Sequence, residues 1–267
     1  MKNVFRITIK KIMTASLCII FASCNLFSSQ DKPPKIQKSV LVIINDVSGS
    51  IKLTDAEIEK EQVWLKKYWH SNFKPQSDVA LLSVNSTSNS ALNIKWFKWQ
   101  FSENKSAEEF QSETEKIMEA SNEENDNLIQ KAQIQKQVLE ELKVQSQSNG
   151  ANQSEIIELT PLLAKAIEKY YTSVQIVYLS DMCQNSSKVT FNSHTLQSKQ
   201  RAEQYARVHA KEITKEFSLK GNILEKVTSI TILVPIQTND TYEVLPFFYQ
   251  EFFGCFGYKK PVIWESL

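Results

Sequence analysis

The fold is decided by residues 40–50, Val40-Leu41-Val42-Ile43-Ile44-Asn45-Asp46-Val47-Ser48-Gly49-Ser50. The first five residues are apolar and four of them are β-branched, which predicts a strand too hydrophobic to face water on either side. Such a strand belongs at the centre of a parallel sheet. It ends at Asp46, and Ser48 and Ser50 follow on a turn, so a carboxylate and two hydroxyls gather at its carboxyl end. Open α/β sheets bind their ligands at this end, and we expect a ligand site there.

Extended and helical patterns alternate along the rest of the chain. This alternation predicts a doubly wound α/β fold, with a mostly parallel central sheet and helices on both faces. Residues 93–101 alternate between apolar and polar positions, so we expect one antiparallel edge strand there. The other strands are expected at residues 78–84, 174–181 and 226–235. Residues 262–264 are expected to close the chain as a packed tail.

Helices are predicted between these strands. The first should begin at Thr54, because Thr54 and Glu57 have the spacing of a capping box. Residues 105–146 are polar and contain no proline or glycine, and a helical insertion is expected over about residues 105–150. A turn-like break at residues 121–127 would make it a hairpin. The remaining helices are expected after Thr160 and at residues 197–217 and 242–257.

Two further polar residues are expected at the same edge of the sheet as Asp46. Thr160 comes directly before Pro161, which fits a helix N-cap followed by proline at the first helical position. Residues 174–181 form another apolar strand, and it ends in Asp181. An oxygen-rich site at this edge would therefore draw on three separate segments of the chain.

Asp46-Val47-Ser48-Gly49-Ser50, Thr160 and Asp181 resemble, in this order, the three motifs of the metal-ion-dependent adhesion site (MIDAS) of von Willebrand factor A-type (VWA) domains. The resemblance covers most of residues 40–264, with the helical insertion as its main departure. Another departure is Met182, since the family often has glycine at this place. The resemblance implies a Rossmann-like VWA domain over residues 39–267.

The family pattern also implies a mechanism. Ser48 and Ser50 would bind a cation directly, Thr160 directly or through water, and Asp46 and Asp181 at least partly through water. All five offer hard oxygen atoms, which suit Mg²⁺ best, with Mn²⁺ or Ca²⁺ as alternatives. The open coordination position would be filled by an Asp or Glu of a partner protein. We therefore expect a protein-binding module and no enzyme.

Two other classes stay open. Haloacid-dehalogenase-type phosphatases also begin with a hydrophobic strand that ends in Asp, but they need a second Asp where Ser48 stands. The chain has no Gly-x-Ser-x-Gly, His-Glu-x-x-His or glycine-rich phosphate loop, which argues against a metal-dependent hydrolase. The other alternative is a structural envelope lipoprotein with a vestigial metal site, in which Asp46, Ser48 and Ser50 only stabilise a turn.

Residues 1–23 are typical of a bacterial lipoprotein signal peptide. Their apolar run, residues 12–22, is too short for an ordinary membrane-spanning helix. Phe21-Ala22-Ser23-Cys24 resembles a lipobox, which implies cleavage before Cys24 and a diacylglyceryl group on its sulfur. A plain secretory signal is the alternative. Residues 24–38 would be a flexible tether, and the protein would be lipid-anchored in the bacterial cell envelope, on the periplasmic or surface side.

Charge and cysteines set further limits. The chain has 31 basic and 30 acidic residues, which gives no support for nucleic-acid binding because that needs a clustered basic surface. Of the four cysteines, Cys18 would leave with the signal and Cys24 would carry lipid. Cys183 and Cys255 are expected about 20 Å apart by helix geometry, whereas a disulfide needs Cα atoms within about 7 Å. We expect two free thiols.

Overall fold

The computed structural model describes residues 38–47, 53–84, 94–100, 113–146, 154–167, 171–186, 189–192, 195–235 and 243–267. All of them belong to one compact unit, Gln37–Leu267. The predicted signal segment, the tether, Cys24, Ser48 and Ser50 lie outside the described residues. The elements, in chain order, are β1 (Lys38–Asp46), α2 (Asp55–Asn72), β2 (Ser77–Val84), β3 (Ile94–Phe97), α3 (Glu113–Ser146), the 3₁₀ helix η2 (Ile157–Leu159), α4 (Thr160–Ala166), β4 (Tyr171–Leu179), α5 (Lys199–Phe217), β5 (Val227–Val234), α6 (Leu245–Cys255) and β6 (Ile263–Ser266).

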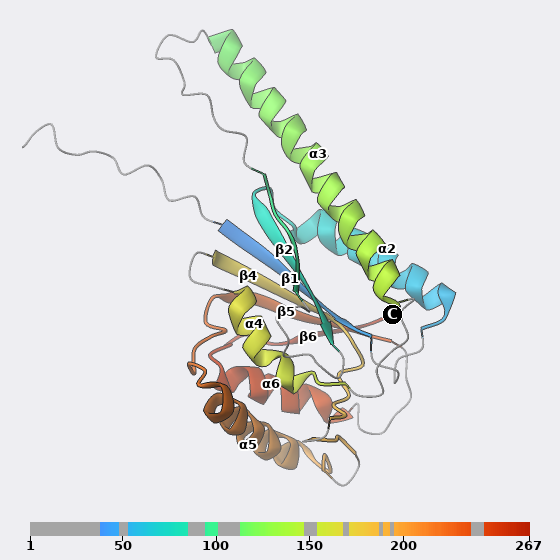
Figure 1. Cartoon of the computed structure of the whole chain (residues 1–267), viewed down its shortest axis with the longest axis vertical. Helices are drawn as coiled ribbons and strands as arrows, with labels where there is room; N and C mark the ends of the chain where they lie inside the picture. The colour runs from blue at the N-terminus through green and yellow to red at the C-terminus, as the bar shows by residue number, and fades with distance from the viewer. Residues whose placement is uncertain are drawn as a thin grey trace, which may run out of the picture. The chain divides into compact units, whose positions relative to one another are not determined.

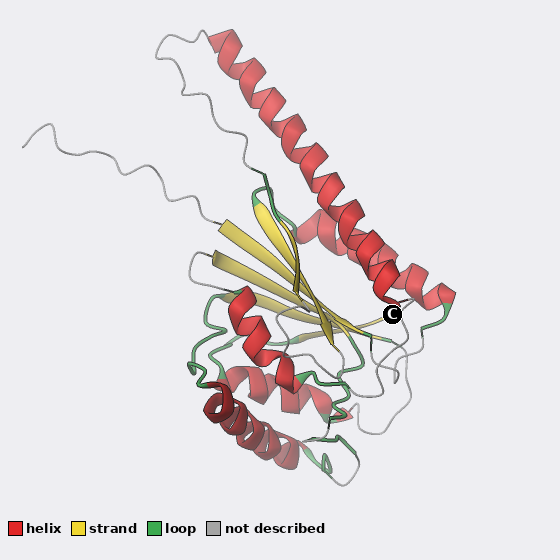
Figure 2. Cartoon of the chain, in the orientation of Figure 1, coloured by secondary structure: helices red, strands yellow, loops and turns green. Residues whose placement is uncertain are grey.

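The six strands form one sheet in the order β3-β2-β1-β4-β5-β6 (Figures 1 and 2). The pair β2–β3 is antiparallel and the other four pairs are parallel, as the sequence predicts. Val262 and Trp264 pack against the core, as expected for a packed tail, but the expectation missed a sixth strand. Ile263 begins β6, which pairs with β5 from Thr231 opposite Ile263 onward. This strand is short and mostly exposed, so it lacks the apolar run that marks the inner strands.

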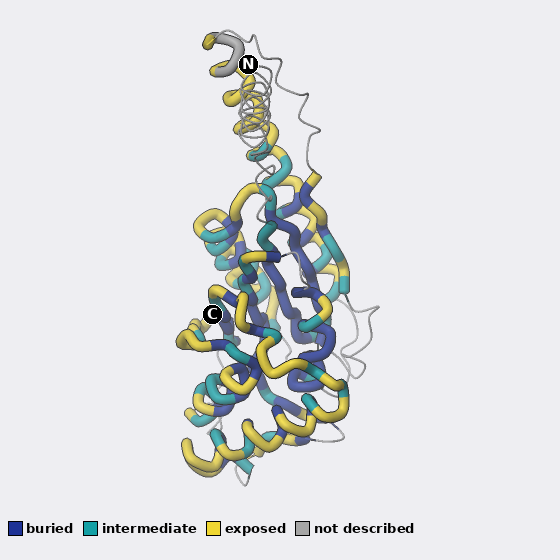
Figure 3. The backbone as a smooth tube through the Cα atoms, turned by 90° about the vertical axis from the view of Figure 1, so that its left-hand side faces the viewer, coloured by how far each residue is buried: buried dark blue, intermediate teal, exposed yellow. Residues whose placement is uncertain are grey.

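Helices cover both faces of the sheet. On β1, Val40, Val42 and Ile44 share a core with α4, α5 and α6, while Leu41 and Ile43 share another core with α2 and α3. Successive side chains of a strand point to opposite faces, so a continuous apolar run contributes to both cores. Each fully buried side chain of this kind stabilises the fold by about 2 kcal/mol. In Figure 3 the inner strands are accordingly mostly dark blue, and the helices carry many yellow residues.

The predicted capping box begins α2. The Thr54 side chain accepts a hydrogen bond from the Glu57 N–H at 3.3 Å, and the Glu57 carboxylate accepts one from the Thr54 N–H at 2.7 Å. Two N–H groups that the helix itself leaves unpaired are thereby satisfied. Leu65 and Trp69 then bury the inner side of the helix against the sheet.

The insertion contains one continuous helix, α3, so the predicted break at residues 121–127 is wrong. The polar residues there include no proline or glycine, and an exposed helix accommodates them. Among the described residues, the C-terminal half of α3 packs on the body, through Ile134, Val138 and Leu142. The N-terminal half extends beyond the sheet (Figures 1 and 3).

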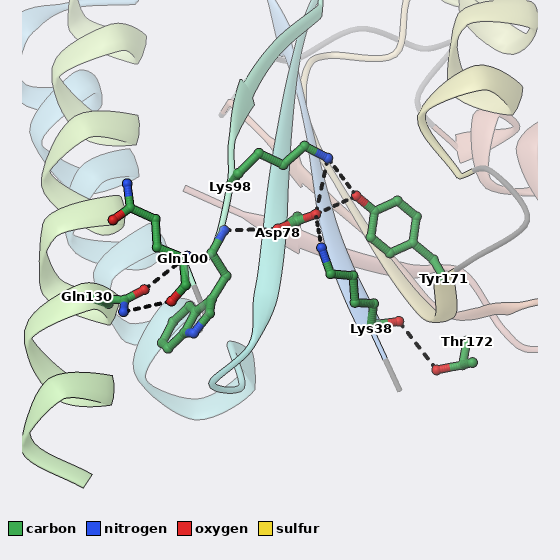
Figure 4. A network of polar contacts seen from close by, with 8 residues as sticks. Lys38, Asp78, Lys98, Gln100, Gln130, Tyr171 and Thr172 are labelled. Atoms are coloured by element: carbon green, nitrogen blue, oxygen red, sulfur yellow. Dashed lines mark hydrogen bonds and ion pairs between the residues drawn. The ribbon is translucent and has the colours of Figure 1, made fainter. Parts of the chain in front are cut away.

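A buried carboxylate, Asp78, joins strands at the amino end of the sheet (Figure 4). Its Oδ2 accepts hydrogen bonds from the Tyr171 hydroxyl at 2.7 Å and the Lys98 ammonium at 3.1 Å, with Lys38 3.6 Å away. Its Oδ1 accepts one from the Trp99 N–H at 2.9 Å. Burial alone would raise the pKa of Asp78, but these hydrogen bonds and the Lys98 charge outweigh it and lower the pKa. Asp78 thus ties β2 to β1, to β4 and to the residues after β3.

The remaining predictions concern the last helix and the thiols. Four aromatic residues of α6, Phe248, Tyr249, Phe252 and Phe253, are buried, while Phe247 is partly exposed. Cys183 and Cys255 are both free, as expected.

None of the helices in the described ranges combines the length and apolar character needed to cross a membrane.

Candidate functional site

The candidate site lies at the carboxyl ends of β1 and β4, neighbours in the middle of the sheet. Asp46 is the last residue of β1, and Asp181 follows the end of β4 by two positions. Because the strands are parallel and Asn45 lies opposite Leu179, both ends reach the same edge. Asp46 is 7% exposed and Asp181 is 2% exposed. The structure thus brings two of the five predicted ligands together where little water reaches them.

Two serine hydroxyls bind Asp46. Its Oδ2 accepts hydrogen bonds from Ser180 Oγ at 2.8 Å and from Ser154 Oγ at 3.1 Å, and both serines are buried. Neither serine was predicted from the sequence. Ser180 had a signal, since it is a polar residue at the end of an apolar strand, directly before Asp181. Ser154 had none, because it closes a polar loop far away in the chain.

Burial strongly perturbs Asp181. Burial raises the pKa of Asp181 to about 7, and the charge of Asp46 contributes to the increase, although the Cys183 N–H opposes it by donating to Oδ1 at 2.8 Å. When both are ionised, the carboxylates of Asp46 and Asp181 repel each other in a place that little water reaches. A cation beside both carboxylates would offset this repulsion.

The turn after Asp181 has an unusual backbone. Met182 has a φ of 58°, in the left-handed region that favours glycine, at the place where the VWA pattern often has glycine. The turn is held by two hydrogen bonds, one from the Met182 N–H to Ser180 Oγ at 2.8 Å and one from the Tyr249 hydroxyl to the Met182 carbonyl at 2.9 Å. Ser180 therefore supports both the turn and Asp46.

Thr160 is buried, but it does not cap a helix as predicted. It is the first residue of α4 and has helical dihedral angles, because η2 runs directly into α4 and Leu159 takes the N-cap position. Its hydroxyl donates to the Ile157 carbonyl at 2.7 Å and is therefore directed to the backbone rather than to either aspartate. A hydroxyl that donates its hydrogen keeps its lone pairs, so this bond does not prevent coordination.

A second buried carboxylate cluster, which the sequence did not indicate, supports η2. Glu158 accepts hydrogen bonds from Gln184 Nε2 at 2.6 Å and from Ser186 Oγ at 2.7 Å. Gln184 Oε1 in turn accepts one from the Ile157 N–H at 2.9 Å. These contacts fix the start of the α4 segment against the loop that carries Asp181.

The described donors fit a hard divalent cation. Two ionised carboxylates would balance the charge of Mg²⁺, and hydroxyl oxygens such as those of Ser154 and Ser180 are neutral donors of the same hard type. Asp46 and Asp181 are the residues that would hold the ion. Among the described residues, no group of three or more His, Cys, Asp or Glu side chains could hold a metal ion.

No protein-family model and no curated protein matches the chain. Solved structures do. The crystal structure of the SpRpn10 VWA domain is 11% identical at a TM-score of 0.37, with 87% of this chain and 88% of that chain covered. The human COPII-coat protein Sec24c is 6% identical at a TM-score of 0.39, with 86% of this chain and 29% of that chain covered. At these scores, the site has to be judged by its own geometry.

Proposed function

We propose that this chain is a protein-binding module that uses a divalent cation, most simply Mg²⁺, at Asp46 and Asp181. The observation that carries the proposal is the burial of these two carboxylates at adjacent strand ends, close enough for the charge of Asp46 to raise the pKa of Asp181. Two like charges in a poorly solvated place are unfavourable unless a cation compensates them. The order of the sequence motifs, with Ser48, Ser50 and Thr160 as further ligands, supports the same assignment.

The partner would reach the cation from outside. Mg²⁺ takes six oxygen ligands and usually keeps several waters, so two aspartates and a few hydroxyls leave positions to exchange. An Asp or Glu carboxylate of a partner protein has the charge and hardness to replace one water. The chain would then hold its partner through a shared ion, and Mn²⁺ or Ca²⁺ could take the same place.

The cellular setting follows from the N-terminal sequence. The signal-like residues 1–23 and the lipobox-like residues before Cys24 support a lipid-anchored protein of the bacterial envelope. On this proposal residues 24–38 tether the domain, and the chain acts by binding without catalysing a reaction. Neither nucleic acid nor a cofactor other than the cation is required.

The test is isothermal titration calorimetry of the whole chain with MgCl₂ and MnCl₂. The wild type is expected to bind one ion, and Asp46→Asn and Asp181→Asn are expected to lose binding while keeping their circular dichroism spectra. Asp78→Asn is the matched control, because it removes a buried carboxylate from the opposite edge of the same sheet. It is expected to lower stability and leave ion binding unchanged.

The alternatives predict different results. A well-folded wild type that binds neither ion at millimolar concentration contradicts the proposal and favours the scaffold, in which the serine hydroxyls alone stabilise Asp46. Turnover of p-nitrophenyl phosphate that needs Mg²⁺ and disappears in Asp46→Asn would favour a hydrolase instead.

A further inference from the structure

The N-terminal half of α3 stands apart from the body of the domain. The hydrogen bonds that join α3 to described parts of other elements begin at Gln130, whose side chain binds the Gln100 backbone through both its amide atoms. Next to it, the Lys131 ammonium donates to the Phe73 carbonyl at 2.8 Å. The first buried residue of the helix is Ile134. Residues 113–129 therefore extend about 25 Å beyond the attachment point at 1.5 Å per residue.

This projecting half, residues 113–129, carries an apolar stripe. Ile117 is 71% exposed, Met118 63%, Leu128 58% and Ile129 55%. Ile117 and Leu128 are eleven residues apart, about three helical turns, so they lie on the same face, and Met118 and Ile129 repeat this spacing beside them. The stripe therefore consists of two apolar pairs, with the uncharged residues Ser121 and Asn125 on the same face between them. Exposed apolar side chains that share one face mark an interaction site more often than scattered ones do.

The charge of α3 changes where the helix meets the body. Residues 113–129 contain six acidic residues and one lysine. Residues 130–146 contain three lysines and two glutamates. The apolar stripe therefore lies on an acidic segment, whereas the more basic half already packs on the sheet.

Such a segment gains stability from a partner. Helices in proteins are stabilised mainly by packing of one face against other elements, and residues 113–129 lack such packing among the described residues. The projecting half also contains asparagine, serine and aspartate, which are weak helix formers. Burying the stripe against a second helix would supply the packing that the body does not provide.

We propose that the projecting half of α3 binds a basic amphipathic helix of another protein. An apolar face on that helix would cover Ile117, Met118, Leu128 and Ile129, and its lysines and arginines would meet the acidic residues beside them. A second copy of this chain fits less well, since two projecting halves would place acid against acid. An anionic membrane surface is disfavoured by the same charge.

The test uses a fluorescein-labelled model peptide of leucine and lysine, patterned as an amphipathic helix of about 18 residues to match the projecting half. The control peptide replaces lysine with glutamate. Binding to the whole chain is followed by fluorescence anisotropy at low salt. The basic peptide is expected to bind at least about tenfold more tightly than the acidic one and to lose affinity as salt screens the charges. Hydrogen exchange should slow in residues 113–129.

Variants locate the site. Ile117→Ser combined with Leu128→Ser should weaken binding about tenfold or more with unchanged thermal stability. Val144→Ser is the matched control, because it removes an exposed valine, 62% accessible, from the other half of α3. Equal binding by the double variant, or equal binding of both peptides, would overturn the proposal. So would a concentration-dependent dimer of the wild type that the double variant loses, or tight binding to phosphatidylcholine vesicles without any peptide.

Discussion

Met182 adopts a backbone conformation that residues with a Cβ rarely take, yet its side chain is fully buried. The hydrogen bonds to Ser180 and from Tyr249 hold the turn in place. The turn follows Asp181 directly, and the Ser180 hydroxyl that accepts from the Met182 N–H also donates to Asp46. Met182, where the sequence resemblance led us to expect glycine, thus has a backbone conformation that glycine adopts without steric cost.

The positive φ of Met182 reverses the usual order of stability between alanine and glycine variants. Met182→Gly and Met182→Ala both remove the buried side chain, but glycine adopts a positive φ without steric cost. The free energy of unfolding of the glycine variant should therefore exceed that of the alanine variant by about 1 kcal/mol, although alanine is usually the better tolerated of the two. Urea denaturation of the pair measures the difference. An alanine variant of equal or greater stability would mean that the turn is not left-handed.

Glu61 lies one helical turn before Leu65 on α2, and burial raises its pKa to about 7 from 4.5. The folded state therefore takes up a proton between these values, so the contribution of Glu61 to stability is full below pH 4.5 and is lost as the pH rises through 7. In the Glu61→Gln variant the free energy of unfolding should change less with pH over this range. At pH 8 the variant should be more stable than the wild type by up to about 3 kcal/mol. Urea unfolding between pH 4 and 8 checks this; parallel profiles would contradict it.

At the scale of elements, the inner strands were predictable because each is an uninterrupted apolar run. The misjudged elements are those whose structure depends on partners rather than on local pattern. Residues 121–127 look like a turn, yet they continue α3. The short strand β6 forms because β5 offers an edge, and Thr160 does not cap α4 because a 3₁₀ turn precedes it.

The Asp78 cluster joins elements and can be weakened by one atom. Tyr171→Phe removes the hydroxyl that donates to Asp78 Oδ2. A buried carboxylate that loses a donor costs about 1–3 kcal/mol, so the unfolding free energy at pH 7 should fall by this amount. Lys95→Met, which breaks an exposed ion pair with Glu141, is the control and should change stability by less than about 1 kcal/mol. If urea denaturation gave the same loss of unfolding free energy for Tyr171→Phe and Lys95→Met, the Asp78 cluster would not contribute to stability as proposed.

At the scale of the whole molecule, sequence reasoning located Asp46 and Asp181 at one edge because both follow buried parallel strands. It could not find Ser154, whose contact with Asp46 depends on the path of a distant loop. Nor could it give the direction of the Thr160 hydroxyl, which depends on the turn before it. The prediction that the first 23 residues are a signal and Cys24 a lipid site stays a prediction.

The compact unit Gln37–Leu267 should fold without the residues before it, because both cores and the whole sheet lie within it. A chain that begins at Gln37 is expected to unfold in one transition, with a melting temperature within a few degrees of that of the full chain. Differential scanning calorimetry of the two chains compares them. A large fall in melting temperature would show that earlier residues contribute to the core.

The pairing of β1 with β4 also bears on the order in which the protein assembles. The Ser180 hydroxyl reaches Asp46 across 134 residues of chain, with the whole insertion between them. Contacts this distant in sequence form late and make folding slow. We expect the two carboxylates to meet only when β1 pairs with β4, a step slowed by closing so long a loop. An ion that binds the folded chain and not the unfolded one would stabilise the folded state by mass action.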